Sequence, residues 1–265
     1  MEETKQIYFN QQGKKRKKRF FSSHYWDEIS NYTNYFSHED SSVLEVGCGS
    51  GGSYHSSSDE SVLANIKGIK IDYPSTGENL KGLMKAAFYD PNPLVRLEHK
   101  GLYWIKIKGT EDAKTNEPDE DYVIPFRKAR TVQTASEQNV SYGKSITIIT
   151  YDIGVCSAKR ASGNFQGKVE IIDLRTISPI NEFAIFESAS NHGKYILLTE
   201  DPVFISFEHS IDSRISQNCF KKLDAPVIVI DAENLSAIPF NSILEKTMLP
   251  NADKVEIAVQ ELLNY

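Results

Sequence analysis

The alternation of short apolar strands with amphipathic helices is the feature that most restricts the fold of this 265-residue chain. Within residues 51–104 the sequence predicts a helix over 58–66, a strand over 69–71, a second helix over 78–89 and a strand over 94–97. Helix and strand units of this length are typical of a parallel sheet that carries helices on its faces. We therefore predict an α/β fold built on mainly parallel sheets.

The second predicted helix has a clear apolar face. Leu80, Leu83, Met84 and Ala87 recur at helical spacing, so we expect them to face the core together. The alternation continues to the C-terminus in a second unit. That unit is expected to contain strands over 145–151, 169–174, 194–199 and 227–230, and helices over 155–162, 181–190, 204–223 and 254–263.

Composition shifts divide the chain into four parts. Residues 1–50 are expected to hold an amphipathic helix, a strand and a glycine loop. Residues 51–107 are expected to form a partial α/β domain, and residues 127–265 a complete doubly wound α/β domain. The acidic, turn-rich segment 108–126 reads as a linker between those two domains.

Charge and cysteine usage exclude several classes of protein. The net charge of −6 makes the whole chain a poor partner for nucleic acid, and the basic run 14–19 is interpreted as a solvated arm. We see no apolar segment long enough to span a membrane and no signal peptide, so we expect no membrane association. Three cysteines without metal-ligand spacing suit the reducing cytoplasm, which is the expected location.

His55 is the strongest catalytic candidate in the sequence. It lies in a Gly/Ser-rich loop before a predicted helix, and ligands of doubly wound sheets bind at loops that follow strands. A histidine titrates near neutrality and can therefore transfer protons. The alternative is a loop histidine beside serines that cap the next helix.

Ala87, Asp90 and Asn92 are the candidate metal ligands. A helix that ends in Asp-Pro-Asn-Pro offers backbone carbonyls and a carboxylate to a hard cation. The alternative is a helix stop enforced by Pro91 and Pro93, with no ion involved.

Much of the chain resembles a known family, the β subunits of the thiamine-diphosphate-dependent 2-oxo acid dehydrogenases (E1 components). The similarity covers roughly residues 51–265. It rests on motifs in the order in which that family has them, which are YHSSS, SVLANIKGIKI, KGLMKAAFYDPNP, LEHKGLYW, EPDEDYVIP, IIDLRT, LTE, LDAP and LPN.

The resemblance implies both a fold and a function. Residues 127–265 would form a transketolase-like C-terminal domain, and residues 51–107 part of a domain that binds the pyrimidine ring of thiamine diphosphate. His55 would be the active-site histidine where the α and β subunits meet. The reaction would be oxidative decarboxylation of a 2-oxo acid, followed by acyl transfer to the lipoyl domain of an E2 acyltransferase. An E1 α subunit would hold the diphosphate and Mg²⁺, and Ala87, Asp90 and Asn92 would match a structural K⁺ site.

The first 50 residues depart from the family. They lack a matching context for the glutamate that activates the cofactor and for the aromatic residue that stacks on it. They resemble instead the start of a class I S-adenosylmethionine-dependent methyltransferase, because an apolar strand enters the glycine loop 47–51 and Asp72 ends the next strand. Two alternatives therefore stand beside the dehydrogenase subunit, an inactive remnant that keeps the assembly domain and a small methyltransferase.

Overall fold

The predicted alternation of strands and helices is present in most of the part of the chain that the structure describes. The described end of the predicted helix 58–66 departs from it, because residues 65–68 form turns and a bend. The computed structural model describes residues 43–47, 63–103, 108–202, 206–234 and 241–265, all of which fall within one unit, residues 42–265. Its elements are β1 (Val43–Gly47), β2 (Lys70–Asp72), α4 (Gly77–Phe88), β3 (Leu94–Glu98), α5 (Lys100–Tyr103), η1 (Glu111–Ala113), β4 (Arg130–Gln133), α6 (Glu137–Ser141), β5 (Ile146–Thr150), α7 (Ile153–Ser162), β6 (Val169–Asp173), β7 (Thr176–Ser178), α8 (Glu182–His192), β8 (Tyr195–Pro202), α9 (Phe207–Cys219), η2 (Phe220–Lys222), β9 (Ile228–Ala232), α10 (Ser242–Met248) and α11 (Ala252–Leu263).

Strands from the C-terminal half form one sheet, called here the second sheet, in the order β4-β6-β5-β8-β9. The four strands predicted from apolar runs, β5, β6, β8 and β9, are all parallel, as expected. The edge strand β4 was not predicted, and it pairs with β6 in the antiparallel direction.

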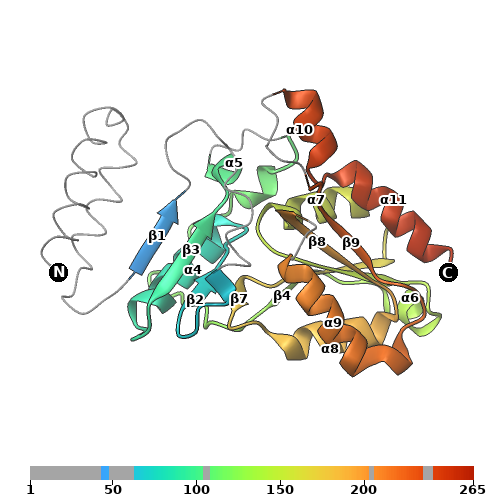
Figure 1. Cartoon of the computed structure of the whole chain (residues 1–265), viewed down its shortest axis with the longest axis horizontal. Helices are drawn as coiled ribbons and strands as arrows, with labels where there is room; N and C mark the ends of the chain where they lie inside the picture. The colour runs from blue at the N-terminus through green and yellow to red at the C-terminus, as the bar shows by residue number, and fades with distance from the viewer. Residues whose placement is uncertain (1–42, 48–62, 104–107, 203–205, 235–240) are drawn as a thin grey trace, which may run out of the picture. The chain divides into compact units, whose positions relative to one another are not determined.

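The two faces of the second sheet carry two separate apolar clusters. Ile148 and Ile196 face the cluster that α7 and α11 cover. Their neighbours Ile149 and Leu197 face the other cluster, which α8 and α9 cover. Figure 1 shows these two helix pairs on opposite sides of the strands. Because successive side chains in a strand alternate between faces, a run of isoleucine and leucine supplies both clusters.

The remaining strands form the first sheet, in the order β1-β3-β2-β7. β1 and β2 both pair with β3 in parallel. The last strand, β7, comes from the middle of the C-terminal half and pairs antiparallel with β2 through Ile71 and Asp72. Part of the predicted second domain therefore completes the first sheet, although the predicted domain boundaries themselves stay a prediction.

Asp173, at the end of β6, links the second sheet to the start of α4 through hydrogen bonds. Its Oδ2 accepts hydrogen bonds from Ser75 Oγ at 2.5 Å and from Asn79 Nδ2 at 2.9 Å. Its Oδ1 accepts from the backbone amide of Arg175 at 3.0 Å. Ser75 and Asn79 lie at the start of α4, where the Thr76 hydroxyl caps the helix. A buried carboxylate with three donors thus holds α4 against the second sheet.

Helix α4 forms where expected, but its buried face is rotated from the predicted one. Leu83 and Ala87 are buried as predicted, whereas Met84 is 46% exposed. Asn79, Gly82 and Ala86 are buried instead. The reason is that the polar contact of Asn79 with Asp173 and the close packing at Gly82 set the orientation of the helix, and apolar content alone does not.

The acidic segment 108–126 packs against α4 in its second half. Tyr122 donates a hydrogen bond from its hydroxyl to Glu78 at 2.7 Å, and Ile124 is buried with its amide bonded to the carbonyl of Gly82. Lys81 bonds to Glu117 at 2.8 Å. This segment therefore covers one side of the helix as well as connecting the two sheets.

Candidate functional site

The carboxyl ends of three parallel strands bring together one histidine and two acids. His99 directly follows β3, Asp152 lies two residues after the end of β5, and Glu200 lies near the end of β8. The Nε2 atom of His99 is 3.2 Å from Oε2 of Glu200, and the charges of both acids act on the His99 ring. β3 belongs to the first sheet and the other two strands belong to the second. This acid–histidine cluster therefore joins the two sheets at the carboxyl ends of their strands, which is where such folds bind ligands.

Asp152 holds a backbone conformation that normally favours glycine. Its φ is +52° and its ψ is −134°, which is strained for any residue with a Cβ atom. The residue is 4% exposed, and its Oδ1 atom has no hydrogen-bond partner among the described residues. Burial, together with the charges of Glu200 and Asp173, raises its pKa to about 7, although His99 acts in the opposite direction. Strain and a carboxyl pKa near neutrality are both typical of functional positions.

His99 makes two contacts that favour different protonation states. Burial lowers its pKa, but the hydrogen bond to Glu200 and the charges of Asp152 and Glu200 outweigh burial and raise the pKa to about 9. The backbone amide of Gly101, however, donates a hydrogen bond to Nδ1 at 3.0 Å. A ring nitrogen that accepts a hydrogen bond carries no proton, so this second contact requires the neutral ring.

The acid–histidine cluster can store a proton close to neutral pH. A carboxyl group near pH 7 and a histidine above it can exchange protons with a neighbouring group without a large energetic cost. Metal binding is not indicated here, since no group of three histidine, cysteine or acidic side chains in the described part of the chain is arranged to hold an ion.

Three of the features predicted from the sequence cannot be compared with the structure. His55 and the glycine loop 48–51 lie outside the described residues, as does the basic run 14–19. The role of His55 therefore stays a prediction. Asp72, the acid considered for a methyltransferase ribose contact, is fully buried, and both of its carboxylate oxygens accept hydrogen bonds from Arg96, at 2.8 and 2.6 Å. It is not available to a ribose.

The predicted cation ligands lie together at the end of α4, where the oxygens of Ala87 and Asp90 already accept hydrogen bonds. Asp90 Oδ1 accepts hydrogen bonds from the amide and the side chain of Asn92, at 2.9 and 2.8 Å. Asp90 Oδ2 accepts from the ammonium group of Lys70, and the carbonyl of Ala87 accepts from the Asp90 amide at 3.2 Å. Burial raises the pKa of Asp90, but the hydrogen bonds from Lys70 and Asn92 outweigh it and leave the pKa below its usual value.

This arrangement does not fit a bound K⁺ ion without rearrangement. An alkali cation needs several oxygen lone pairs directed at one point, whereas here Lys70 already neutralises the carboxylate. Lys70 is further held over the ring of Phe126, with its Nζ atom 5.1 Å from the ring centroid. The K⁺ site stays a prediction, and the contacts favour the alternative of a helix stop closed by an internal ion pair.

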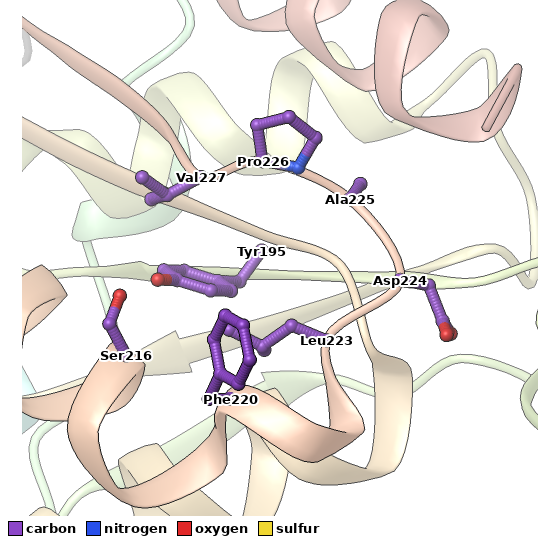
Figure 2. A pocket seen from close by; sticks show the side chains of 8 residues that line it. All are labelled: Tyr195, Ser216, Phe220, Leu223, Asp224, Ala225, Pro226 and Val227. Carbon is purple, nitrogen blue, oxygen red and sulfur yellow. The ribbon is translucent and has the colours of Figure 1, made fainter.

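A surface hollow of about 510 Å³ lies at the opposite edge of the second sheet. Figure 2 shows its lining, which comes from the start of β8, the end of α9 and the segment before β9. Tyr195 and Phe220 present their rings there, and the Tyr195 hydroxyl donates to Asp212 at 2.7 Å. Because the strands begin at this edge, the hollow is not where a doubly wound sheet usually binds a substrate.

The sequence places each residue of the acid–histidine cluster near the end of a strand, but it does not show that the three residues meet. His99 follows an apolar strand, Asp152 follows another, and Glu200 is part of a matching motif. Each lies at a carboxyl strand end, which is the correct place for a site. What the sequence lacks is the pairing between the two sheets that brings His99 to Glu200.

The comparisons with known proteins are consistent with one another. Residues 136–255 match the family model described as "Transketolase, C-terminal domain". Over 218 residues the chain is 37% identical to the 2-oxoisovalerate dehydrogenase subunit beta of Bacillus subtilis (strain 168), which covers 81% of this chain and 62% of that protein. It is 34% identical over 200 residues to the pyruvate dehydrogenase E1 component subunit beta of Rhizobium meliloti (strain 1021), covering 74% of this chain and 40% of that protein.

A solved structure gives a matching fold. A split gene transketolase, described as an inactive β4 tetramer, superposes with a TM-score of 0.57 at 16% identity and covers 77% of this chain and 60% of that one. This likeness concerns the fold alone. The chain spans less than two thirds of the length of each of these relatives. In the described part of the chain, every helix is too short or too polar to cross a membrane.

Proposed function

We propose that this chain, which is related to the E1 β subunits of the 2-oxo acid dehydrogenases and carries a transketolase C-terminal domain, works as a β-type subunit of such an E1 component. The observation that carries the proposal is the identity of 37% to a branched-chain enzyme subunit over 218 residues. The reaction would be oxidative decarboxylation of a 2-oxo acid, with transfer of the acyl group to the lipoyl domain of an E2 partner. Cysteine usage suggests that the subunit works in the cytoplasm.

The described residues suggest how work is divided between this chain and its partner. When bound, thiamine diphosphate supplies the carbanion chemistry of the reaction. At the carboxyl ends of the strands, Glu200 is partly exposed and its negative charge would disfavour a diphosphate, whereas Asp152 and Asp201 are buried. This negative charge supports the assignment of the diphosphate and Mg²⁺ to an E1 α subunit, with which this chain would form a hetero-oligomer.

Within the proposed complex, His55 would be the proton-transferring residue of this chain. Its imidazole titrates near neutrality and would hold or deliver a proton at the reacting centre. No cofactor-binding residue of this chain is assigned, because the segment that would carry the family's cofactor-activating glutamate has no counterpart in residues 1–50.

A non-catalytic subunit is the second candidate function. It is favoured by residues 1–50, which offer no matching context for the glutamate that activates the cofactor. In this case the chain would use its C-terminal domain for assembly alone.

Co-expression with an E1 α subunit tests the first candidate. We expect a complex by size-exclusion chromatography with light scattering, and release of CO₂ from pyruvate or a branched-chain 2-oxo acid in the presence of thiamine diphosphate and Mg²⁺. His55→Ala should then lower the rate by about two to four orders of magnitude. The matched control is His209→Gln, because His209 is a half-exposed histidine on α9.

The outcomes separate the candidates. A stable complex without turnover on any 2-oxo acid would support the non-catalytic subunit, and the absence of any complex would contradict both. Turnover that His55→Ala leaves unchanged would contradict the assignment of His55, while the proposed E1 role would stand.

A further inference from the structure

We propose that His99 is a proton-operated switch between two local structures, one that closes the first turn of α5 and one that tightens the contact between the two sheets. The proposal rests on the acid–histidine cluster of His99, Asp152 and Glu200 and on the amide of Gly101. It does not depend on the proposed enzymatic function.

The neutral ring satisfies one set of contacts. Nε2–H donates to Glu200 at 3.2 Å, and Nδ1 accepts the amide of Gly101 at 3.0 Å. Gly101 is the second residue of α5 (Lys100–Tyr103), so its amide has no partner within the helix. His99 therefore acts as the cap of this short helix when the ring is uncharged.

The charged ring satisfies a different set. A proton on Nδ1 would point at the Gly101 N–H, and two donors cannot share a hydrogen bond. The first turn of α5 must then move away. In exchange, the positive charge is attracted by Glu200 and Asp152, both of which belong to the second sheet. Protonation thus replaces the hydrogen bond between His99 and the Gly101 amide with a stronger attraction between His99 and the two acids that lie at the second sheet.

The surroundings of His99 bring the two states close in free energy. Around Asp152, the groups that act on the carboxyl are His99, Glu200 and Asp173, with the Cys156 thiol on α7 also within its range. Burial, which lowers the pKa of His99, and the contacts with Glu200 and Asp152, which raise it, together set that pKa at about 9. The Gly101 hydrogen bond stabilises only the neutral ring, and a bond of ordinary strength lowers the midpoint by about 1 pH unit. The midpoint of the switch is therefore expected at about pH 8, so that both states are populated at mildly alkaline pH.

Asp152 sets the sensitivity of the switch. Its carboxyl group titrates at about pH 7, so it is charged above that pH and neutral below it. Its unpartnered Oδ1 atom and strained backbone show that packing does not account for an acid at this position. Glycine would fit the same backbone without strain, which leaves the charge acting on His99 as the effect of having aspartate here.

NMR of the full chain, with ¹⁵N-labelled histidine and glycine, tests the proposal. We expect His99 to titrate with a midpoint above 6.5 and no higher than about 9, and the Gly101 amide resonance to shift with the same midpoint. The ¹⁵N signals of the ring should show Nδ1 without a proton at high pH and with one at low pH. His192 and His209 serve as internal references in the same spectra.

Two variants sharpen the test. Asp152→Asn should lower the His99 midpoint by about 1 to 2 pH units, because one negative charge is removed. Asp253→Asn, which removes an exposed acid on α11, should leave it unchanged. The proposal is overturned if the Gly101 amide does not follow His99 in the unmodified chain, or if His99 titrates below 6.5. Because these readouts come from the unmodified chain, they hold even where a variant does not fold.

Discussion

The two sheets of this protein differ in how they obtain their cores. The second sheet has one apolar cluster that is built from its own strands, from α7 and α11, and from Phe165 in the α7–β6 connection. The cluster on its other face is shared, since it includes Ile71, Val95 and Leu97 of the first sheet beside Ile149 and Leu197 of the second. The first sheet also takes its last strand, β7, from the C-terminal half.

This difference indicates a hierarchy of stability within one unit. The second sheet can bury apolar residues on both faces from local elements, as expected of a doubly wound domain. The first sheet reaches the same burial only when the second is already formed. We expect the second sheet to unfold last and the first to respond to changes in either. The following experiments can break or sharpen this comparison.

Truncation of the second sheet's core should have the largest effect. Ile196 is fully buried in the cluster between α7 and α11, so Ile196→Ala should cost about 2 to 5 kcal/mol of unfolding free energy. Amide exchange should speed up in both sheets. The matched change outside the second sheet is Leu83→Ala in α4, where Leu83 is fully buried. It should speed exchange in α4 and leave β5 and β8 protected. Continued protection of β2 and β3 in Ile196→Ala would disprove the hierarchy.

The next effect concerns the polar link between the sheets. Asp173→Ala leaves Ser75, Asn79 and the Arg175 amide without their acceptor, at a cost of about 2 to 3 kcal/mol. We expect a lower melting temperature and faster exchange at the start of α4. Ser188→Ala is the control, because Ser188 bonds to Glu170 and Thr147 within the second sheet. If both variants loosen α4 equally, Asp173 is not the specific link.

A smaller effect is expected from the packing of α4 against the segment 117–124. A Cβ atom at Gly82 would lie 2.5 Å from Cγ1 of Ile124, so Gly82→Ala must push the 117–124 segment away from α4. The cost should be about 1 to 3 kcal/mol by chemical denaturation. Gly163→Ala is the control, since its added methyl group makes only an ordinary contact at 3.4 Å. It should be neutral or stabilising by about 0.5 kcal/mol. Equal destabilisation by both would argue against close packing at Gly82.

The smallest effect concerns potassium. Because Lys70 already neutralises Asp90, replacing KCl with NaCl at equal ionic strength should change the unfolding free energy by less than about 0.5 kcal/mol. Lys70→Met should lower stability by about 1 kcal/mol, and only in this variant should K⁺ restore part of the loss. The control is Lys81→Met, whose partner Glu117 is largely exposed. Stabilisation of the unmodified chain by K⁺ in preference to Na⁺ would restore the predicted ion site.

The sequence predicted the central strands of the second sheet better than the strands that depend on partners elsewhere in the chain. β5 and β8 are apolar runs rich in isoleucine and leucine, and such runs report burial on both faces without knowledge of their neighbours. β4 and β7 are short, and β4 has two exposed residues, so their local sequence contains little strand signal. They form because β6 and β2 offer them hydrogen bonds, which is information that lies elsewhere in the chain.

The candidate site shows the same limit. His99 and Glu200 could each be placed at a strand end from the sequence, but their pairing depends on the register between two sheets. The buried face of α4 was misplaced for a related reason. Met84 fits the apolar pattern, yet the hydrogen bonds of Asn79 to Asp173 turn the helix and leave Met84 largely in solvent. Long-range polar contacts of this kind leave no periodic signal.

The position of β7 has a consequence for synthesis on the ribosome. The pairing of Asp72 with Thr176 joins residues 104 positions apart in the chain. At about 5 to 20 residues per second, roughly 5 to 20 s pass between the synthesis of β2 and that of β7. During this interval the nascent chain carries a sheet whose β2 edge is unpaired, and open edges of this kind invite pairing with other chains. Translation speed between codons 72 and 178, and access of chaperones to that edge, should therefore influence the yield of folded protein.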